Sequence, residues 1–455
     1  MGVFAAAAKS ATGYLDVAAN SHGKEKGEFV YRALRRTRSE SPHVVEVGPG
    51  GGAAVRFLAS RLAADPVDRG DVTVTLIEAP GITSRSLTSA IEEFNKVGVC
   101  TLKRGLAQDI GDLLGEPVDV ISASALLHEV YSYGGGYSGL HSVMQTLPGV
   151  IKPGGFFVYR DVYAVHGASL HERVTQTYAA RSWLQFIRVF TPLYLSEGTH
   201  PYHRSSDDPV IRQDGRTIAL SEVNPKTCAV ITAPVGLFRE LQRRYITFRD
   251  YAWRSGVLGF RPELDGLLAA DWIDAGSGHK RVHYSLTEAN RLSRQQSAML
   301  TAVSEPYADH YVVDGDIFDE CTDAALVGFL TAAEAGDSQC ASVWKDWSTR
   351  EGRETYAYLT VEELLTEFVI SSAEAGGTVM IPRLAHDVTT ATRNYYNRYL
   401  RHRLANPLTD SKQLVLFSNV PASDVDAIME AMTTVRTRCS KKSLARMHSA
   451  IMQRT

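Results

Sequence analysis

The sequence predicts an α/β fold with a doubly wound, mostly parallel sheet and a large, mostly helical insertion. An apolar run at residues 44–47 ends in a glycine-rich turn at residues 48–52, and a helical stretch follows at residues 53–64. A strand, a turn and a helix in this order are typical of parallel sheets. The length of 455 residues exceeds one ordinary core, so we expect a second domain or a large insertion.

The glycine-rich turn contains Gly48, Gly50 and Gly52 directly after the first expected strand. A turn without Cβ atoms lets the backbone approach a ligand closely. The helix that follows would direct its unpaired N–H groups at the same ligand. The turn therefore predicts a site for a nucleotide-like cofactor.

Two kinds of cofactor fit this turn. Gly48, Gly50 and Ala53 satisfy a loose dinucleotide fingerprint, which expects an acid about 20 residues later. Glu78 closes the next expected strand, at residues 72–77, and comes later than that spacing. Glu46 lies inside the first strand, where a buried carboxylate is costly unless it meets a cation. A cofactor with an ammonium group is favoured, and a dinucleotide is the alternative.

At this motif the chain resembles the class I S-adenosylmethionine-dependent methyltransferases. Their first motif has the form acid-x-Gly-x-Gly-x-Gly, which Glu46, Gly48, Gly50 and Gly52 match. The resemblance implies S-adenosyl-L-methionine as the cofactor. It also implies a Rossmann-like sheet of seven strands, whose last two form an antiparallel hairpin preceded by a helix.

Further cofactor contacts follow from the same resemblance. Glu78 matches the acid that holds the two ribose hydroxyls, and Asp109 matches the acid beside the adenine amine. Ser124 ends the expected fourth strand, at residues 118–124, and is assigned to the cofactor site. The third and fifth strands are expected at residues 99–104 and 151–159.

The last helix and hairpin do not follow the fifth strand directly. Helical stretches come first, at residues 169–191, 235–253 and 287–304. Near the end of the chain, Thr360 with Glu363 three residues later predicts a capped helix. Strands are expected after it at residues 378–382 and 413–417. The sheet is therefore expected to be interrupted.

This arrangement predicts four segments. Residues 1–165 form the cofactor domain, in which residues 13–26 fold over the cofactor as a lid, and residues 166–350 form an inserted substrate-recognition cap. Residues 351–420 return to the sheet, and residues 421–455 form a basic helical tail. In the alternative architecture the first domain ends near residue 290 and residues 280–286 form a strand of the sheet.

Catalytic groups are expected at the carboxyl ends of the strands, where open α/β sheets bind their ligands. His128 is the candidate general base, because the ordinary pKa of histidine suits that role near neutrality. Alternatively, His128 packs under a helix and bonds a carbonyl. Glu129 could orient the imidazole, bind a substrate amine or cap a helix, and Asp161 at the end of the fifth strand could touch the substrate.

Substrate contacts are expected from Tyr131, Tyr133 and Arg160. Arginine forks bind carboxylate or phosphate, and aromatic rings stack on planar ligands. The resemblance implies methyl transfer, and the expected cap, rich in arginine and aromatic residues, indicates a polar small molecule as the substrate. A methyltransferase directed at RNA or nucleotides is one alternative, and aminocarboxypropyl transfer or non-catalytic cofactor binding is another.

The composition of the chain bears on its binding partners and its cellular location. A net charge of −3 gives no overall attraction to nucleic acid or to an anionic membrane. The five cysteines are scattered without CxxC spacing, which fits a reducing compartment, and the cytoplasm is the expected location. No apolar run approaches a membrane span of about 20 residues. No metal site is predicted, and the sequence does not indicate an oligomeric state.

Overall fold

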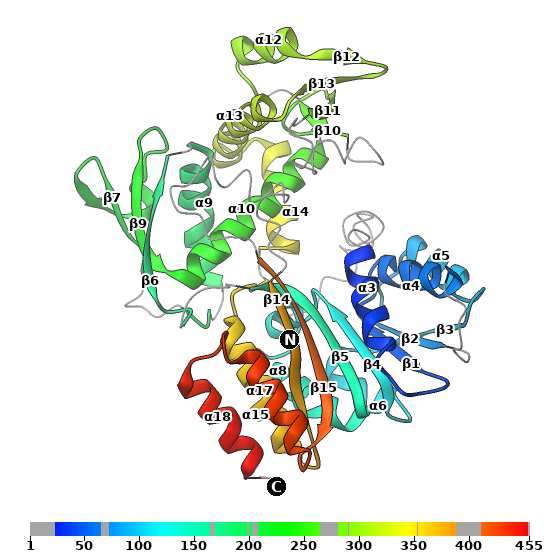
Figure 1. Ribbon diagram of the computed structural model, residues 1–455. Coiled ribbons are helices and arrows are strands. Elements are labelled where there is room, and N and C mark those ends of the chain that lie inside the picture. Colours follow the sequence, from blue (N-terminus) through cyan, green and yellow to red (C-terminus); the bar gives the residue numbers. More distant parts are fainter. Residues whose placement is uncertain are drawn as a thin grey trace. The chain divides into compact units, whose positions relative to one another are not determined.

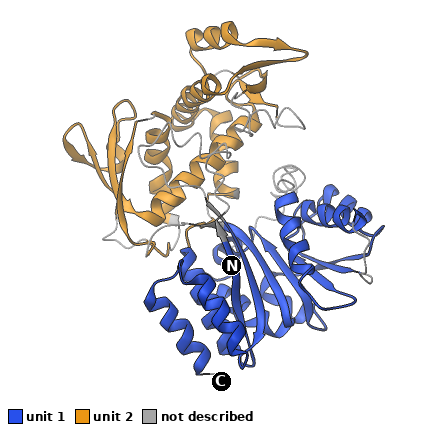
Figure 2. Ribbon diagram, viewed as in Figure 1, with its two compact units in different colours: residues 1–163, 359–388, 412–455 blue, residues 164–358, 389–411 orange. Residues whose placement is uncertain are grey.

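The computed structural model describes residues 23–64, 72–163, 169–179, 181–197, 200–202, 208–263, 281–289, 291–352, 354–387 and 411–453. The chain forms two compact units (Figure 2). Unit 1 comprises Met1–Tyr163, Leu359–Val388 and Lys412–Thr455, and unit 2 comprises Ala164–Tyr358 and Thr389–Ser411. The chain therefore leaves unit 1 after the fifth strand of its sheet and returns to it nearly two hundred residues later.

Unit 1 contains a seven-stranded sheet in the order β14-β15-β5-β4-β1-β2-β3 (Figure 1). The first five strands pair in parallel, whereas β14 and β15 pair antiparallel. The expected seven-stranded sheet with an antiparallel last hairpin is confirmed. The strands are β1 (His43–Val47), β2 (Thr73–Glu78), β3 (Val99–Arg104), β4 (Val118–Ser124), β5 (Ile151–Tyr163), β14 (Thr378–Asp387) and β15 (Ser411–Pro421).

Helices cover both faces of this sheet. Neighbouring side chains of β5 pack against helices on opposite faces. Phe156 and Val158 belong to the apolar cluster of α3 (Gly23–Leu34), α4 (Ala53–Ala64) and α5 (Arg85–Phe94). Phe157, between them, stacks on Phe368 of α15 (Val361–Ala375) with ring centroids 5.5 Å apart. Because neighbouring residues of a strand face opposite sides, consecutive side chains at the end of β5 also reach different helices.

The remaining elements of unit 1 are short or pack against α15 or β14. The 3-10 helix η1 (Ala107–Asp109) and α6 (Ile110–Leu113) follow β3, and α7 (Leu127–Tyr133) and α8 (Tyr137–Val150) connect β4 to β5. The basic tail forms α17 (Val425–Val435) and α18 (Lys441–Met452). Helix α18 packs against α15, with Arg446 Nη2 3.1 Å from Glu367 Oε1, so the tail belongs to unit 1.

Unit 2 contains two four-stranded sheets in addition to helices. Their orders are β6-β9-β7-β8 and β10-β11-β13-β12. The helix expected at residues 235–253 is α10, but residues 173–178 of the first expected helical stretch form β6. Its sequence, RVTQTY, is rich in β-branched residues, which favour a strand. Strand β11 pairs with β10 and β13, so the alternative architecture, which placed it in the large sheet, is wrong.

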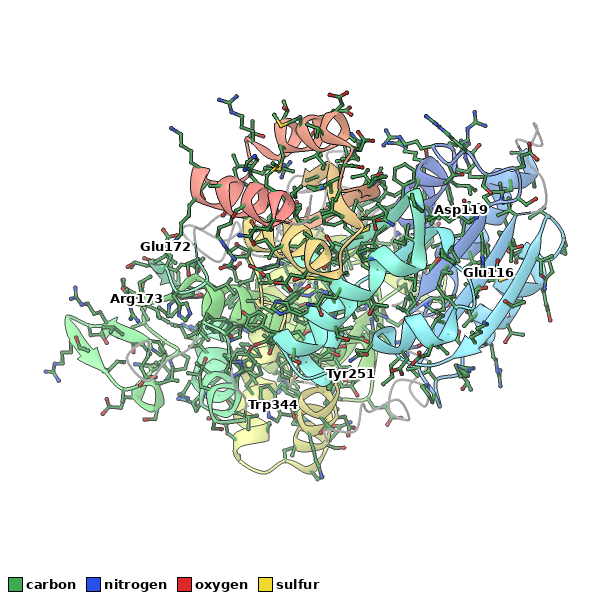
Figure 3. The ribbon with its side chains drawn as sticks, turned by 90° about the horizontal axis from the view of Figure 1, so that it is seen from below. Glu116, Asp119, Glu172, Arg173, Tyr251 and Trp344 are labelled. Carbon is green, nitrogen blue, oxygen red and sulfur yellow. The ribbon has the colours of Figure 1, made fainter. Side chains whose placement is uncertain are left out.

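The helices of unit 2 are packed through aromatic side chains. Trp344 contacts Phe248 of α10 edge to face, with centroids 5.1 Å apart; Trp344 and Tyr251 are labelled in Figure 3. The helices are α9 (Arg181–Glu197), α10 (Val235–Ser255), α12 (Arg294–Val303), α13 (Gly315–Glu334) and α14 (Ser338–Arg350). The strands are β6 (Arg173–Tyr178), β7 (Val210–Gln213), β8 (Arg216–Ile218), β9 (Ala229–Pro234), β10 (Phe260–Pro262), β11 (Arg281–Leu286), β12 (Glu305–Tyr307) and β13 (His310–Asp314).

Across the described part of the chain, we find no helix long and apolar enough to cross a membrane.

Helix α15 begins with the capping box that the sequence predicts. The backbone N–H of Glu363 donates to Thr360 Oγ1 at 3.2 Å, and Glu363 Oε2 accepts from the N–H of Thr360 at 2.8 Å. Two N–H groups at the start of the helix are thereby satisfied.

We predict that Thr360→Ala lowers the free energy of unfolding of unit 1 by about 1 kcal/mol, because the cap is lost. The measurement is a chemical denaturation curve followed by circular dichroism. Thr360→Ser retains the hydroxyl and should lie close to wild type. Equal midpoints for the Ala and Ser variants would contradict this account of the cap.

Candidate functional site

The turn after β1 has the backbone conformation that glycine favours. Gly48, Gly50 and Gly52 have φ angles of +69°, +54° and +76°. Side chains are disfavoured in this region of conformational space, and a Cβ on Gly52 would lie only 2.7 Å from Ala90 Cβ. The N–H of Gly48 donates to Ile77 O at 2.9 Å, which joins the end of β1 to that of β2. The turn is thus fixed directly before the N-terminus of α4.

Glu78, the last residue of β2, lies against this turn. Its carboxylate accepts hydrogen bonds from the backbone N–H groups of Ala79, at 2.9 Å, and Gly50. Burial raises the pKa of Glu78 and the nearby Glu129 adds to this, while the two backbone donors and Arg104 oppose it. The structure therefore brings three predicted residues together: Glu78, Gly50 and Glu129.

Asp109 and Ser124 lie after β3 and at the end of β4. Asp109 is the last residue of η1 and is exposed. Ser124 Oγ accepts a hydrogen bond from Arg160 Nη1 at 3.4 Å. Since the carboxyl ends of parallel strands meet at one edge of a sheet, Glu78, Asp109 and Ser124 all belong to the edge that carries the glycine turn.

Glu46 lies within β1 and is only 6% exposed. Burial raises its pKa to about 7, and the positive charge of Lys26 on α3 acts in the opposite direction. The pKa of Lys26 is lowered to about 8 by burial and by Arg160, whereas Glu46 and Glu25 raise it. A buried carboxylate and a half-buried ammonium group of the chain itself thus lie close enough for their charges to interact.

Helix α3 brings Lys26 to this place through close packing on α4. A Cβ on Gly23 would lie 2.6 Å from Ala53 O, and one on Gly27 would lie 2.6 Å from Phe57 Cδ1. The two glycines are one turn apart and let the helices approach closely. The helix contains residues 23–26 of the expected lid, and residues 13–22 lie outside the described part of the chain.

His128 and Asp161 form a buried pair at the ends of β4 and β5. His128 Nδ1 lies 3.2 Å from both carboxylate oxygens of Asp161. The side chains are 5% and 0% exposed, respectively. The Tyr159 hydroxyl donates to Asp161 Oδ2 at 3.1 Å, which fixes the carboxylate. The sequence predicts Glu129 as a possible partner of the His128 imidazole. In the structure, Asp161 is the carboxylate that contacts this imidazole.

The residues expected to bind substrate lie on α7 and β5. Tyr131 contacts the ring of Tyr137 edge to face, with centroids 5.1 Å apart, and Tyr133 ends α7 and is partly exposed. Burial raises the pKa of Tyr137. Arg160 is 6% exposed, and its Nε donates to Glu25 Oε1 at 2.6 Å. Arg160 Nη2 has no hydrogen-bond partner among the described residues.

Sequence reasoning did not single out Ala125, which follows Ser124. Its φ of 56° lies in the left-handed region, which costs an alanine about 1 kcal/mol. Such strain is characteristic of functional sites. The next residue, Leu126, comes within 3.2 Å of the position that a Cβ on Gly48 would occupy. An alanine gives no sequence signal for this conformation.

Unit 1 contains two hollows. One, of about 450 Å³, lies beside Glu25 and is lined by Phe29 of α3 and Leu414 of β15. The other, of about 830 Å³, lies at the amino ends of β4 and β5 beside the Asp119–Lys152 ion pair; Figure 3 labels Asp119. The described residues contain no group of three or more side chains that could hold a metal ion.

Comparison with known proteins gives similarity in structure only. No family model matches the chain, and no curated protein matches it by sequence. Among solved structures, the CcbJ methyltransferase from Streptomyces caelestis is 20% identical, with 34% of this chain and 58% of CcbJ covered and a TM-score of 0.25. The chain thus spans less than two thirds of CcbJ.

Two further solved structures have similarly low TM-scores to this chain. An O-methyltransferase family protein from Burkholderia thailandensis is 13% identical, with 48% of this chain and 59% of that one covered and a TM-score of 0.26. The N-methyltransferase NodS from Bradyrhizobium japonicum WM9 is 13% identical, with 47% and 98% covered and a TM-score of 0.23. On the strength of its own strand order and hairpin, unit 1 has the fold of the class I S-adenosylmethionine-dependent methyltransferases.

Proposed function

We propose that this chain is an S-adenosylmethionine-dependent methyltransferase that acts on a polar small molecule, with His128 as the general base. The observation that carries the proposal is the buried His128–Asp161 pair, which lies at the same sheet edge as the glycine turn. A base held beside a nucleotide-type turn is what methyl transfer to a protonated nucleophile requires.

The residues at the turn fit S-adenosylmethionine. The glycine turn has no Cβ atoms that would keep a ligand away from its backbone. The Glu78 carboxylate beside Gly50 can accept hydrogen bonds from the two ribose hydroxyls. Glu46 offers a negative charge to the ammonium group, and the exposed Asp109 can accept from the adenine amine. When bound, this cofactor supplies a methyl group on a sulfonium, which a nucleophile can displace.

The hydrogen bonds of His128 define which nitrogen can act as the base. An ionised carboxylate only accepts hydrogen bonds, so Nδ1 carries the proton that it donates to Asp161. The lone pair is then on Nε2, which can take a proton from the substrate nucleophile. Asp161 would stabilise the resulting imidazolium, and the Tyr159 hydroxyl keeps Asp161 in position.

The substrate contacts remain proposals from the sequence that the geometry can accommodate. Tyr131 and Tyr133 lie on the helix that carries His128, so their rings can bind a substrate close to the base. Glu129 lies near Glu78 and thus near the cofactor's proposed ribose position. Arg160 lies on the opposite face of β5 from Asp161, so a role toward the cofactor competes with the substrate-binding role.

We predict that S-adenosylhomocysteine binds more tightly as pH rises toward 7. The pKa of Glu46 in the free protein is about 7, and only the ionised carboxylate pairs with an ammonium group. Below this pKa, binding releases one proton, so the affinity should rise by up to about tenfold per pH unit and level off above it. Titration calorimetry between about pH 5.5 and 7.5 measures this.

Glu46→Gln should remove this pH dependence, and Glu28→Gln, which changes a half-buried α3 carboxylate paired with Arg32 and Arg61, should retain it. An unchanged slope in the Glu46 variant would show that another group releases the proton.

We predict that His128→Gln lowers the rate of methyl transfer by about 10²- to 10⁴-fold while S-adenosylhomocysteine binding stays near that of wild type. Asp161→Asn should cause a comparable loss, because the amide can donate to Nδ1 and thereby move the proton to Nε2. The assay incubates the protein with a metabolite extract and cofactor labelled in the methyl group, and mass spectrometry follows the labelled product.

The same assay identifies the reaction through its by-product. S-adenosylhomocysteine indicates methyl transfer, and methylthioadenosine would indicate aminocarboxypropyl transfer instead. Wild-type rates in both variants would exclude His128 as the base.

A further inference from the structure

Four charged side chains meet at the carboxyl edge of the sheet of unit 1. They are Glu46 of β1, Arg160 of β5, and Glu25 and Lys26 of α3, and we call them the charge quartet. Arg160 Nε donates to Glu25 Oε1 at 2.6 Å, and the charge of Lys26 interacts with those of the other three. Glu46 and Arg160 are each 6% exposed. Two cations and two anions thus lie close together, with Glu46 and Arg160 buried and Glu25 and Lys26 half-buried.

The position of the quartet is fixed by backbone packing. Gly23 and Gly27 allow α3 to contact the first turns of α4, and α4 begins at the glycine turn. Lys26 therefore sits on a helix held against the proposed cofactor site.

The quartet has capacity for one more anion. Arg160 Nη2 is buried and has no hydrogen-bond partner among the described residues, which is costly for a guanidinium group. Lys26 of α3 is a second cation at this place, since its charge acts on that of Arg160. An added carboxylate would stabilise both cations.

We propose that Lys26, with Arg160 beside it, binds the α-carboxylate of the cofactor's amino-acid end while Glu46 binds its ammonium group. This inference rests on the proposed function. The ammonium and carboxylate groups of an α-amino acid are attached to one carbon, so the partner of the carboxylate must lie close to Glu46. Lys26 meets that condition. The amino-acid end of the cofactor carries one positive and one negative charge, so its binding leaves the net charge of the site unchanged.

A substrate anion fits these cations less well. Arg160 reaches α3, whereas its neighbour Asp161 reaches His128 on the other face of β5. The proposed base and the charge quartet are therefore on opposite sides of the strand end. We therefore assign the charge quartet to binding of the cofactor and His128 to proton transfer from the substrate.

The test compares S-adenosylmethionine with decarboxylated S-adenosylmethionine, which lacks only the carboxylate, by titration calorimetry on the full chain. Wild type should bind the decarboxylated ligand roughly tenfold to a hundredfold more weakly, as expected for a charge-assisted hydrogen bond. Lys26→Met should weaken S-adenosylmethionine binding by a similar factor and leave the decarboxylated ligand unaffected. Lys26→Arg should restore the preference, and Lys24→Met on the same helix is the matched control.

Other results of these titrations would overturn either this inference or the proposed function. Equal affinity of wild type for the two ligands would overturn the inference. A Lys26→Met variant that weakens both ligands equally would also overturn it, since Lys26 would then only support Glu46 and α3. If neither ligand binds wild type, the proposed function itself fails. Thermal unfolding of each variant verifies that it is folded.

Discussion

The arrangement of the candidate site depends on a backbone turn with three glycines at positive φ. Because Gly48, Gly50 and Gly52 adopt these angles, β1 can end abruptly and α4 can begin beside it. The bond from Gly48 N–H to Ile77 O fixes the ends of β1 and β2, so Glu78 meets the N–H of Gly50. Larger residues at these positions would strain the turn and fill the space where a ligand would approach the backbone.

The second organising feature is the alternation of side chains along β5. Tyr159 and Asp161 face one side, where they fix the imidazole of His128. Arg160, between them, faces the other side and bonds to Glu25 of α3. One strand end therefore holds the His128–Asp161 pair on one face and the Arg160–Glu25 ion pair on the other, so the carboxylate and the guanidinium group of neighbouring residues are kept apart.

Much of unit 1 could be predicted from sequence because its signals are local. The glycine motif, Glu46 and Glu78 stand at fixed places relative to their strands, and the Thr360 cap lies within four residues. The partnership of His128 with Asp161 joins positions 33 residues apart, and Lys26 reaches Glu46 only through helix packing. Such contacts arise from tertiary structure. The sheets of unit 2 were missed for a related reason, since short strands such as β6 carry weak periodicity.

The central claim is that the glycine turn of unit 1 binds S-adenosylmethionine rather than a dinucleotide. Titration calorimetry with S-adenosylhomocysteine and with NAD tests it most directly. The structure leads us to expect one S-adenosylhomocysteine bound per chain and no binding of NAD, since Glu46 would repel a pyrophosphate and attract an ammonium group. Binding of NAD without binding of S-adenosylhomocysteine would contradict the account.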